Sequence, residues 1–249
     1  MSRRVDELGI DNLKVVQDTD YFCFGMDSIL LANFVKSNSS KNVIVDLCSG
    51  SGVIPIIVNA KQKSKKVYAV ELQKEMYDLL SENIKMNDLQ NDIKILNEDI
   101  KNVNSIKDFI YQNDLSNKVD IITCNPPYKA IGTGIINPTD VKYIARHEEK
   151  CTLEDIFICA NKLLNVKGKL YMVHKPERLA DLITLARKNN MEPKYIRFVY
   201  PKVDMSPSIV LIEYSKKGGN ELKILPPLIE YTSTGEYTEE VYKMYGISK

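Results

Sequence analysis

Residues Asn42 to Gly52, NVIVDLCSGSG, give the clearest indication of the fold of this chain. Its first half is apolar and β-branched, which is typical of a strand buried on both faces of a parallel sheet. Its second half carries Gly50 and Gly52, and a helical pattern over residues 53–60 follows directly. Because glycine has no Cβ, the backbone can turn sharply there and lie against a ligand. The stretch therefore predicts a strand, a ligand-binding turn and a helix.

Apolar strand patterns and amphipathic helical patterns alternate along the rest of the chain. Further strands are expected at residues 66–70, 93–97, 119–124, 169–174, 195–200 and 208–214, and helices near residues 27–35, 74–87, 106–113, 153–164, 177–189 and 238–245. This alternation predicts an α/β, Rossmann-like, doubly wound sheet of seven strands, mostly parallel. No helix separates the last two strands, so an antiparallel C-terminal hairpin strand should end the sheet.

Length and composition favour one domain. A chain of 249 residues with 44% apolar residues can bury a full core, so we expect a single domain over residues 1–249. Residues 1–40 would form an N-terminal segment and helix, and residues 222–249 a C-terminal tail. The longest apolar run, residues 53–58, is far below the roughly 18 residues that cross a bilayer, and no apolar segment follows Arg3 and Arg4 as in a signal peptide. The sequence predicts a cytoplasmic protein without a membrane partner.

The cysteines and the net charge argue against two classes of protein, those that bind a metal and those that attract nucleic acid through their overall charge. The five cysteines form no C-x-x-C pair and lie in apolar surroundings, as reduced thiols do in the cytosol, so we expect no bound metal. A net charge of +1 gives no general attraction to nucleic acid, so any such binding must rest on specific residues. We expect a monomer or a weak dimer.

Asn125, Pro126, Pro127 and Tyr128 directly follow the apolar run 119–124. The Asn125 amide oxygen and the Pro126 carbonyl can both accept hydrogen bonds, and the two prolines hold the backbone near φ −65°. A planar amino nitrogen that donates to both acceptors is drawn out of planarity, which frees its lone pair for attack. Tyr128 offers a flat face for stacking. We predict Asn125, Pro126 and Tyr128 as catalytic, with Asn125 also in contact with the cofactor, and Pro127 and Tyr128 against the substrate. The target is an adenine amine, a cytosine amine or a side-chain amide.

Three acids at predicted strand ends indicate the cofactor. Asp46 precedes the glycine turn and suits an ammonium group, whereas Glu71 can take both hydroxyls of a ribose. Asp99 can accept from an adenine amino group, with Ile100 packed on the ring. Pro55 stands where a dinucleotide-binding G-x-G-x-x-G turn needs its third glycine, which disfavours a nicotinamide oxidoreductase. Together with the two glycines, the set predicts S-adenosylmethionine.

The chain resembles the class I S-adenosylmethionine-dependent methyltransferases that act on amino groups, whose N/D-P-P-Y/F/W motif matches residues 125–128. It is more closely similar to bacterial tRNA adenine-N6 methyltransferases, which modify the adenine 3′ of the anticodon in a valine tRNA. The resemblance covers nearly the whole chain and is carried by LKVVQDTDYFCFGMDSILLANF, VDLCSGSG, AVELQ, NEDI, NPPY, ARHE and PPLIEY with GEYTEE. It implies the fold predicted above and a tRNA partner.

The resemblance also implies cofactor and substrate contacts for residues that lie outside the motifs discussed above. It implies that Phe24, Gly25 and Asp27 approach the methionine end of the cofactor, although Phe24 could equally belong to the core and Asp27 could simply cap a helix. It further implies substrate contacts for Arg146 and His147. These two residues, with Glu148, follow a polar loop over residues 129–139 that is suited to closing over a flipped base, although they could also be a charged helix start.

Other functions share parts of this pattern. An N5-glutamine methyltransferase of peptide release factors uses the same turn, but such enzymes resemble one another in carrying a helical domain for which about 40 residues leave no room. An rRNA or DNA amino-methyltransferase and an RNA-binding protein without turnover are further alternatives. The expected function is methylation of the exocyclic N6 amine of an adenine in the anticodon loop of valine tRNA.

Overall fold

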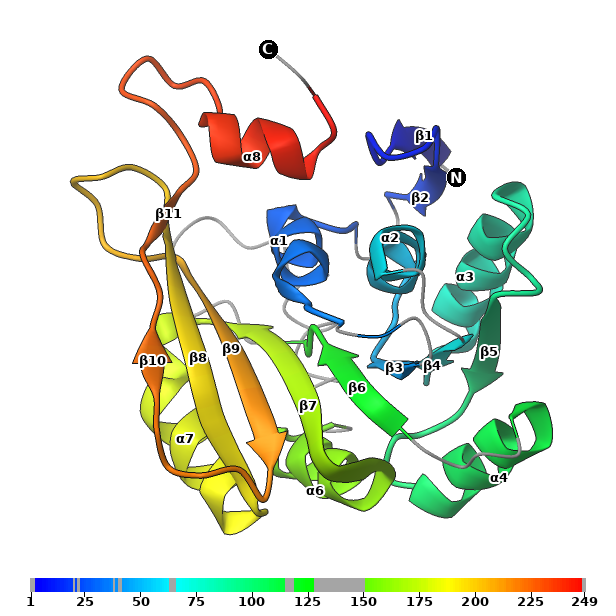
Figure 1. Ribbon diagram of the computed structural model, residues 1–249. Coiled ribbons are helices and arrows are strands. Elements are labelled where there is room, and N and C mark those ends of the chain that lie inside the picture. The colour runs from blue at the N-terminus through cyan, green and yellow to red at the C-terminus, as the bar shows by residue number, and fades with distance from the viewer. Residues whose placement is uncertain are drawn as a thin grey trace.

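A computed structural model describes residues 3–19, 21, 23–37, 39, 42–62, 66–114, 119–127 and 151–247. Its centre is one nine-stranded sheet (Figure 1). The strands are β3 (Val43–Leu47), β4 (Lys66–Glu71), β5 (Ile93–Asn97), β6 (Val119–Cys124), β7 (Leu164–His174), β8 (Met191–Tyr200), β9 (Ile209–Lys216), β10 (Lys223–Ile224) and β11 (Leu228–Ile229). Their order is β10-β8-β9-β7-β6-β3-β4-β5, with β11 also paired to β8.

The sheet is mostly parallel, as predicted. Strands β5, β4, β3, β6 and β7 pair in parallel, and β9 runs antiparallel to both β7 and β8. Two details of the prediction were wrong. The sheet has nine described strands rather than seven, because β10 and β11 are two-residue strands that leave no periodic signal. The antiparallel strand lies inside the sheet rather than at its end, which explains why almost all of β9 is buried.

Helices cover both faces of the sheet, which is the doubly wound arrangement (Figure 1). They are α1 (Met26–Phe34), α2 (Val53–Gln62), α3 (Lys74–Met86), α4 (Val103–Asn113), α6 (Leu153–Leu163), α7 (Leu179–Lys188) after the 3-10 turn η1 (Pro176–Arg178), and α8 (Glu239–Met244). One buried apolar cluster joins α1, α2, α3 and α8 to the sheet, and a second joins α4, α6 and α7 to it. Within the described ranges, no helix has the length and apolar character needed to span a bilayer.

A two-stranded hairpin precedes α1 and was not predicted. It consists of β1 (Arg3–Glu7) and β2 (Lys14–Asp18), and the charged sequence of β1 hides it from a hydrophobic pattern. The hairpin is fastened to α3 by Asn83, which is fully buried and exchanges two hydrogen bonds with the Val16 backbone at 2.7 and 3.1 Å. A side-chain amide thus takes the place of a neighbouring strand.

Helix α1 begins one residue earlier than predicted. Its N-cap is Gly25, and the first turn contains Asp27, so the prediction that Asp27 caps the helix was wrong. A side chain inside the first turn cannot take the N-cap position, and the Asp27 carboxylate instead accepts from the Ser28 backbone N–H at 2.8 Å. Asp27 is buried, with 8% of its surface exposed.

Candidate active site

A pocket of about 420 Å³ lies at the carboxyl ends of the parallel strands, where open α/β sheets bind their ligands. Its wall is built by the N-terminal segment and α1, the glycine turn, the ends of β4 and β6, the segment after β5, and the residues just after β7 and at the start of β9. The lining residues include Phe24, Gly25, Asp27, Ser28, Gly50, Glu71, Asp99, Ile100, Asn125, Pro126, Pro127, Cys151, Lys175 and Ile209. The structure thus brings most of the predicted site residues to one cavity.

The two glycines of the turn have different structural roles. Both have positive φ, +54° at Gly50 and +92° at Gly52. A Cβ on Gly50 would lie 3.8 Å from the Met76 side chain and is otherwise unobstructed, so this glycine leaves room on the pocket side. A Cβ on Gly52 would lie 2.5 Å from the Leu80 Cδ1 atom. Gly52 is therefore needed for close packing against α3 and is not among the lining residues.

The Glu71 side chain, at the end of β4, stabilises the glycine turn by hydrogen bonds. Its Oε2 accepts from the Gly50 N–H and its Oε1 from the Gln73 N–H, each at 2.8 Å. Burial raises the pKa of the Glu71 carboxyl, and the backbone hydrogen bonds oppose that shift. Each carboxylate oxygen keeps a second lone pair. Glu71 can therefore hold the turn and still accept from hydroxyl groups in the pocket.

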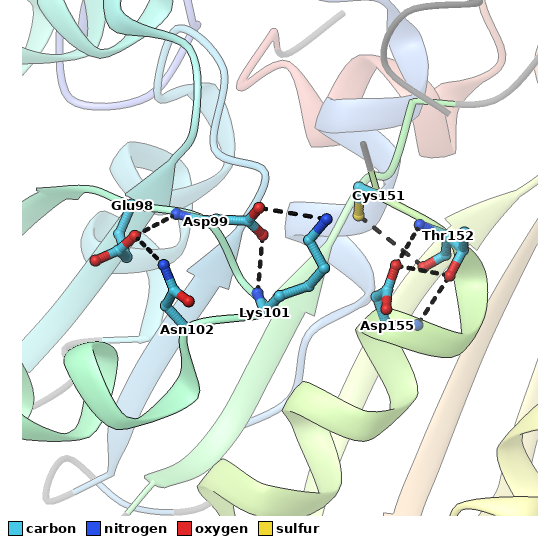
Figure 2. Close-up of polar contacts among 7 residues, drawn as sticks. All are labelled: Glu98, Asp99, Lys101, Asn102, Cys151, Thr152 and Asp155. Atoms are coloured by element: carbon cyan, nitrogen blue, oxygen red, sulfur yellow. Dashed lines mark hydrogen bonds and ion pairs between the residues drawn. The ribbon is translucent and has the colours of Figure 1, made fainter. Parts of the chain in front are cut away.

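Asp99 and Ile100 form the pocket wall after β5. Figure 2 shows the polar contacts of Asp99. The Asp99 carboxylate accepts from the Lys101 N–H at 2.9 Å, with the Lys101 Nζ at 3.5 Å. The Asp99 N–H donates to Glu98 Oε1 at 2.8 Å, and the same oxygen accepts from the Asn102 side chain. These contacts fix the loop with Asp99 at the pocket. Ile100 is buried beside it, as packing against a ring would require.

Cys151 lies just before α6, with its thiol 4.0 Å from the Thr152 carbonyl oxygen (Figure 2). The next residue, Thr152, begins the helix with a capping box, because its hydroxyl accepts from the Asp155 N–H while Asp155 Oδ2 accepts from the Thr152 N–H. Cys151 and Cys48 both line the pocket, although the sequence singled out neither for it. Among the described residues, no group of three or more His, Cys, Asp or Glu side chains is arranged to hold a metal ion.

Asp46 lies beneath the glycine turn and is not among the lining residues. Its side chain is fully buried, Oδ1 accepts from the Thr123 hydroxyl, and Oδ2 has no partner among the described residues. Burial is the main cause that raises the pKa of the Asp46 carboxyl to about 7. The predicted contact of Asp46 with an ammonium group stays a prediction.

The raised pKa of Asp46 predicts a pH-dependent stability. The folded state keeps the proton up to about pH 7, whereas the unfolded chain releases it near its ordinary pKa of 3.8. The protonated Asp46 carboxyl therefore contributes up to about 4 kcal/mol to the free energy of unfolding. This contribution is fully present below about pH 4 and is lost as the pH rises to about 7. Asp46→Asn should become progressively more stable than the wild type over this interval. Urea unfolding at pH 5, 6, 7 and 8 measures the difference, and a constant difference would contradict the raised pKa.

The N-terminal segment is positioned by β2. Gln17 is almost fully buried and its Oε1 accepts from the Phe24 N–H at 2.8 Å. Phe24 both packs against the apolar cluster of α1 and lines the pocket, so the two interpretations of this residue are compatible. Gly25 and Asp27 follow it along the same wall.

Asn125 stands at the end of β6 with its amide anchored to α1. Its Nδ2 donates to the Ser28 hydroxyl oxygen at 3.1 Å. With the amide nitrogen engaged there, the amide oxygen is the atom left to accept from a ligand. Pro126 and Pro127 continue along the pocket wall. Ser28 was not identified from the sequence, because its role depends on how α1 packs beside β6.

Three predicted residues cannot be placed. Tyr128, Arg146 and His147 lie outside the described residues, as does Glu148. Lys175, conversely, lines the pocket and was missed. The only signal for it in the sequence is its position directly after a strand end. His174, the last residue of β7, is buried.

The pocket fits a nucleoside that carries a positive charge and no phosphate. Its described lining includes three carboxylates, Asp27, Glu71 and Asp99, which suit hydroxyl, amino and ammonium groups. Because Gly50 has no Cβ, open space remains where a ligand can approach the backbone. This donor set fits S-adenosylmethionine.

The sequence profile of the TRM5/TYW2 methyltransferase domain matches residues 28–122, which include the glycine turn, Glu71 and Asp99. Over this segment the chain is similar to a methyltransferase domain. Solved structures share the α/β fold of this chain. The chain superposes with a TM-score of 0.68 on a predicted O-methyltransferase from Agrobacterium tumefaciens, at 19% identity over 90% of this chain and 98% of that one. TYW2 from M. jannaschii, in complex with AdoMet, gives a TM-score of 0.52 at 16% identity over 86% and 84%.

Curated proteins that are similar to this chain have a more specific name. The tRNA1(Val) (adenine(37)-N6)-methyltransferase of Histophilus somni strain 129Pt is 29% identical over 67% of this chain, which spans 66% of that relative, just under two thirds of its length. The protein of the same name from Parabacteroides distasonis is 26% identical over 77% of this chain and 76% of its own length.

Proposed function

We propose that this methyltransferase transfers the methyl group of S-adenosylmethionine to the exocyclic N6 amine of an adenine in the anticodon loop of a valine tRNA. The observation that carries the proposal is the placement of Asn125, whose amide nitrogen is held by Ser28 and whose oxygen is left for the pocket. The names of the curated relatives support the same substrate. A tRNA partner would place the enzyme in the cytoplasm.

The proposed cofactor contacts follow the pocket wall. Phe24, Gly25 and Asp27 would take the methionine end, and Glu71 would accept from the ribose hydroxyls. Asp99 would accept from the adenine amino group, with Ile100 against the ring. Gly50 and Gly52 would give the turn its shape, and buried Asp46 would act on the ammonium group through the field it creates beneath the turn.

The bound cofactor would supply an electrophilic methyl group on a sulfonium. Asn125 Oδ1 and the Pro126 carbonyl would accept from the two amine hydrogens and direct the nitrogen lone pair at that methyl group. Both oxygens would also stabilise the positive charge that develops on nitrogen. The N–CH3 bond would form as the S–CH3 bond breaks, and the proton would then leave to water. Because the amine needs no prior deprotonation, no strong base is required.

The target base must leave its stack to reach Asn125. Extrusion costs a few kcal/mol, and less in a loop than in a duplex. Tyr128 would then stack on the base, with Pro127 beside it. Contacts from Arg146 and His147, after the loop over residues 129–139, remain predictions from the resemblance.

Transfer of tritium from labelled S-adenosylmethionine to total small RNA tests the function. We expect label in valine tRNA, recovered as N6-methyladenosine after nuclease digestion. Replacement of the adenine 3′ of the anticodon with guanine in a transcribed tRNA should abolish incorporation. Label transferred instead to a peptide release factor, to rRNA or to DNA in parallel reactions with these acceptors would favour the corresponding alternative and reject the tRNA substrate.

A further inference from the structure

Four of the five cysteines of the chain gather at the pocket, although they are far apart in sequence. Cys48 directly follows β3 and Cys124 ends β6, the neighbouring strand. Cys151 lies just before α6, and Cys159 lies within that helix. The Cys48 thiol is hydrogen-bonded to the thiols of both Cys124 and Cys151. Packing thus joins thiols that no C-x-x-C spacing indicates.

Of these four cysteines, Cys48 and Cys151 are the two that a reagent in the pocket can reach. Both line the pocket and are partly exposed, whereas Cys124 and Cys159 are fully buried. A disulfide holds its two Cβ atoms about 3.8 Å apart. Because the thiols of Cys48 and Cys151 already touch, a small movement of the start of α6 is enough to form the bond.

The backbone at Cys48 has an unusual conformation. Its φ is +59°, in the left-handed region that glycine adopts without strain and that other residues rarely adopt. A side chain kept at such a position costs free energy, and residues of this kind concentrate at functional sites. The conformation of Cys48 therefore indicates that its thiol is used in the pocket.

The reduced pair is protected against weak oxidants. The hydrogen bond with Cys124 is the main cause that raises the pKa of Cys48 well above its usual value. The hydrogen bond with Cys48, followed by burial, raises the pKa of Cys151, and the charges of Asp155 and Asp99 add to that shift. Both groups are therefore thiols rather than thiolates at pH 7, and thiols react slowly. Oxidation needs a reagent that is small enough to enter the pocket and strongly oxidising, as a peroxide is.

We propose that a peroxide oxidises Cys48 and Cys151 to a disulfide that narrows the adenine end of the cofactor pocket. The S–S bond forms as the two thiols lose two protons and two electrons, and these break the O–O bond of hydrogen peroxide to give two molecules of water. The disulfide draws the start of α6 toward the glycine turn. The inference rests on the proposed cofactor contacts, since Asp99, the acid proposed to accept from adenine, is close enough to Cys151 to act on it electrostatically.

Calorimetry with S-adenosylhomocysteine, the product left after methyl transfer, compares the reduced protein with the peroxide-treated protein. We expect oxidation to weaken binding to the wild type about 10-fold, as for the loss of one hydrogen bond with adenine, and dithiothreitol to restore it. Cys151→Ser keeps a side chain of similar size but removes the partner thiol, so its affinity should not respond to peroxide. Cys23→Ser is the matched control and should respond as the wild type does, because Cys23 also lines the pocket but its thiol contacts the Asp18 carbonyl oxygen.

Peptide mapping without reduction identifies the bond and needs neither turnover nor a substrate. Trypsin alone leaves Cys151 and Cys159 in one peptide, whereas additional cleavage after Glu154 separates them. We expect a cross-link between the peptides of Cys48 and Cys151 in the peroxide-treated wild type. The cross-link should form more slowly when S-adenosylhomocysteine fills the pocket, because a ligand that binds the reduced state more tightly also stabilises that state.

The outcomes separate this inference from the proposed function. A reduced wild-type protein that binds no S-adenosylhomocysteine and leaves tRNA unmethylated defeats the proposed function. A cross-link between Cys48 and Cys124, or thiols that are oxidised singly, overturns the inference and leaves the proposed function intact. A mapped bond between Cys48 and Cys151 with unchanged affinity also overturns it, because the bond would then leave the adenine end of the pocket open.

Discussion

Asn125→Ala is expected to lose about 10³-fold in the rate of methyl transfer while still binding the cofactor, because removal of one preorganised polar group that stabilises developing charge costs about 10²–10³. The alanine also releases the anchor to Ser28, 3.1 Å from the Asn125 amide nitrogen in the wild type. Single-turnover tritium transfer to tRNA measures the rate, and calorimetry with S-adenosylhomocysteine measures binding. We expect affinity for the cofactor product within about threefold of the wild type, since Glu71 and Asp99 are untouched.

Ser28→Ala is the graded control for this prediction. It keeps the Asn125 oxygen but removes the hydroxyl that fixes the amide, so the rate should fall only about 3- to 10-fold, the effect of one lost hydrogen bond. Full activity in Asn125→Ala would remove the proposed mechanism. Equal losses in the two variants would mean that Asn125 acts by holding α1 against β6 rather than by directing the amine.

Glu71→Gln is expected to weaken S-adenosylhomocysteine binding about 100-fold. The wild-type carboxylate accepts from the Gly50 and Gln73 N–H groups and still offers lone pairs to ribose hydroxyls. The amide has one acceptor oxygen, so its NH2 group must face either a backbone N–H or the ribose. Hydrogen bonds to a charged group contribute about 1.5–3 kcal/mol, which matches this loss. Calorimetry at pH 7.5 measures the affinity.

The control for Glu71 is Glu75→Gln in the first turn of α3. Glu75 is exposed and lines no part of the pocket, so the variant changes the net charge equally without touching the site. Thermal unfolding of both cofactor-free variants separates a disrupted glycine turn from a lost ligand contact. Unchanged affinity in Glu71→Gln, with the fold intact, would contradict the ribose contact.

Much of the fold could be predicted from local patterns. The parallel strands β3, β4 and β6 lie close to their predicted positions, because a strand covered by helices on both faces must be largely apolar. The β1–β2 hairpin was missed for the opposite reason. Strand β1 reads RRVDE and is mostly exposed, so no hydrophobic pattern marks it, and β2 is held by the buried side chain of Asn83.

The position of β9 could not be predicted. A hairpin pattern predicts that β9 pairs antiparallel with β8. It does not predict whether β9 lies between β7 and β8 or on the other side of β8. In the structure β9 inserts between β7 and β8, where its apolar side chains are covered on both faces. The position of β9 is favoured by the burial of the whole strand and not by the loop that precedes it.

The order of residues along the chain was enough to indicate a parallel sheet, a glycine turn, and acids and an Asn-Pro-Pro motif at strand ends, because each of these is a local pattern. Only packing set the anchor of Asn125 on Ser28 and the full burial of Asp46. Both features join segments far apart in sequence. Their hydrogen bonds and desolvation exist only once α1 and neighbouring strands come together in the folded chain.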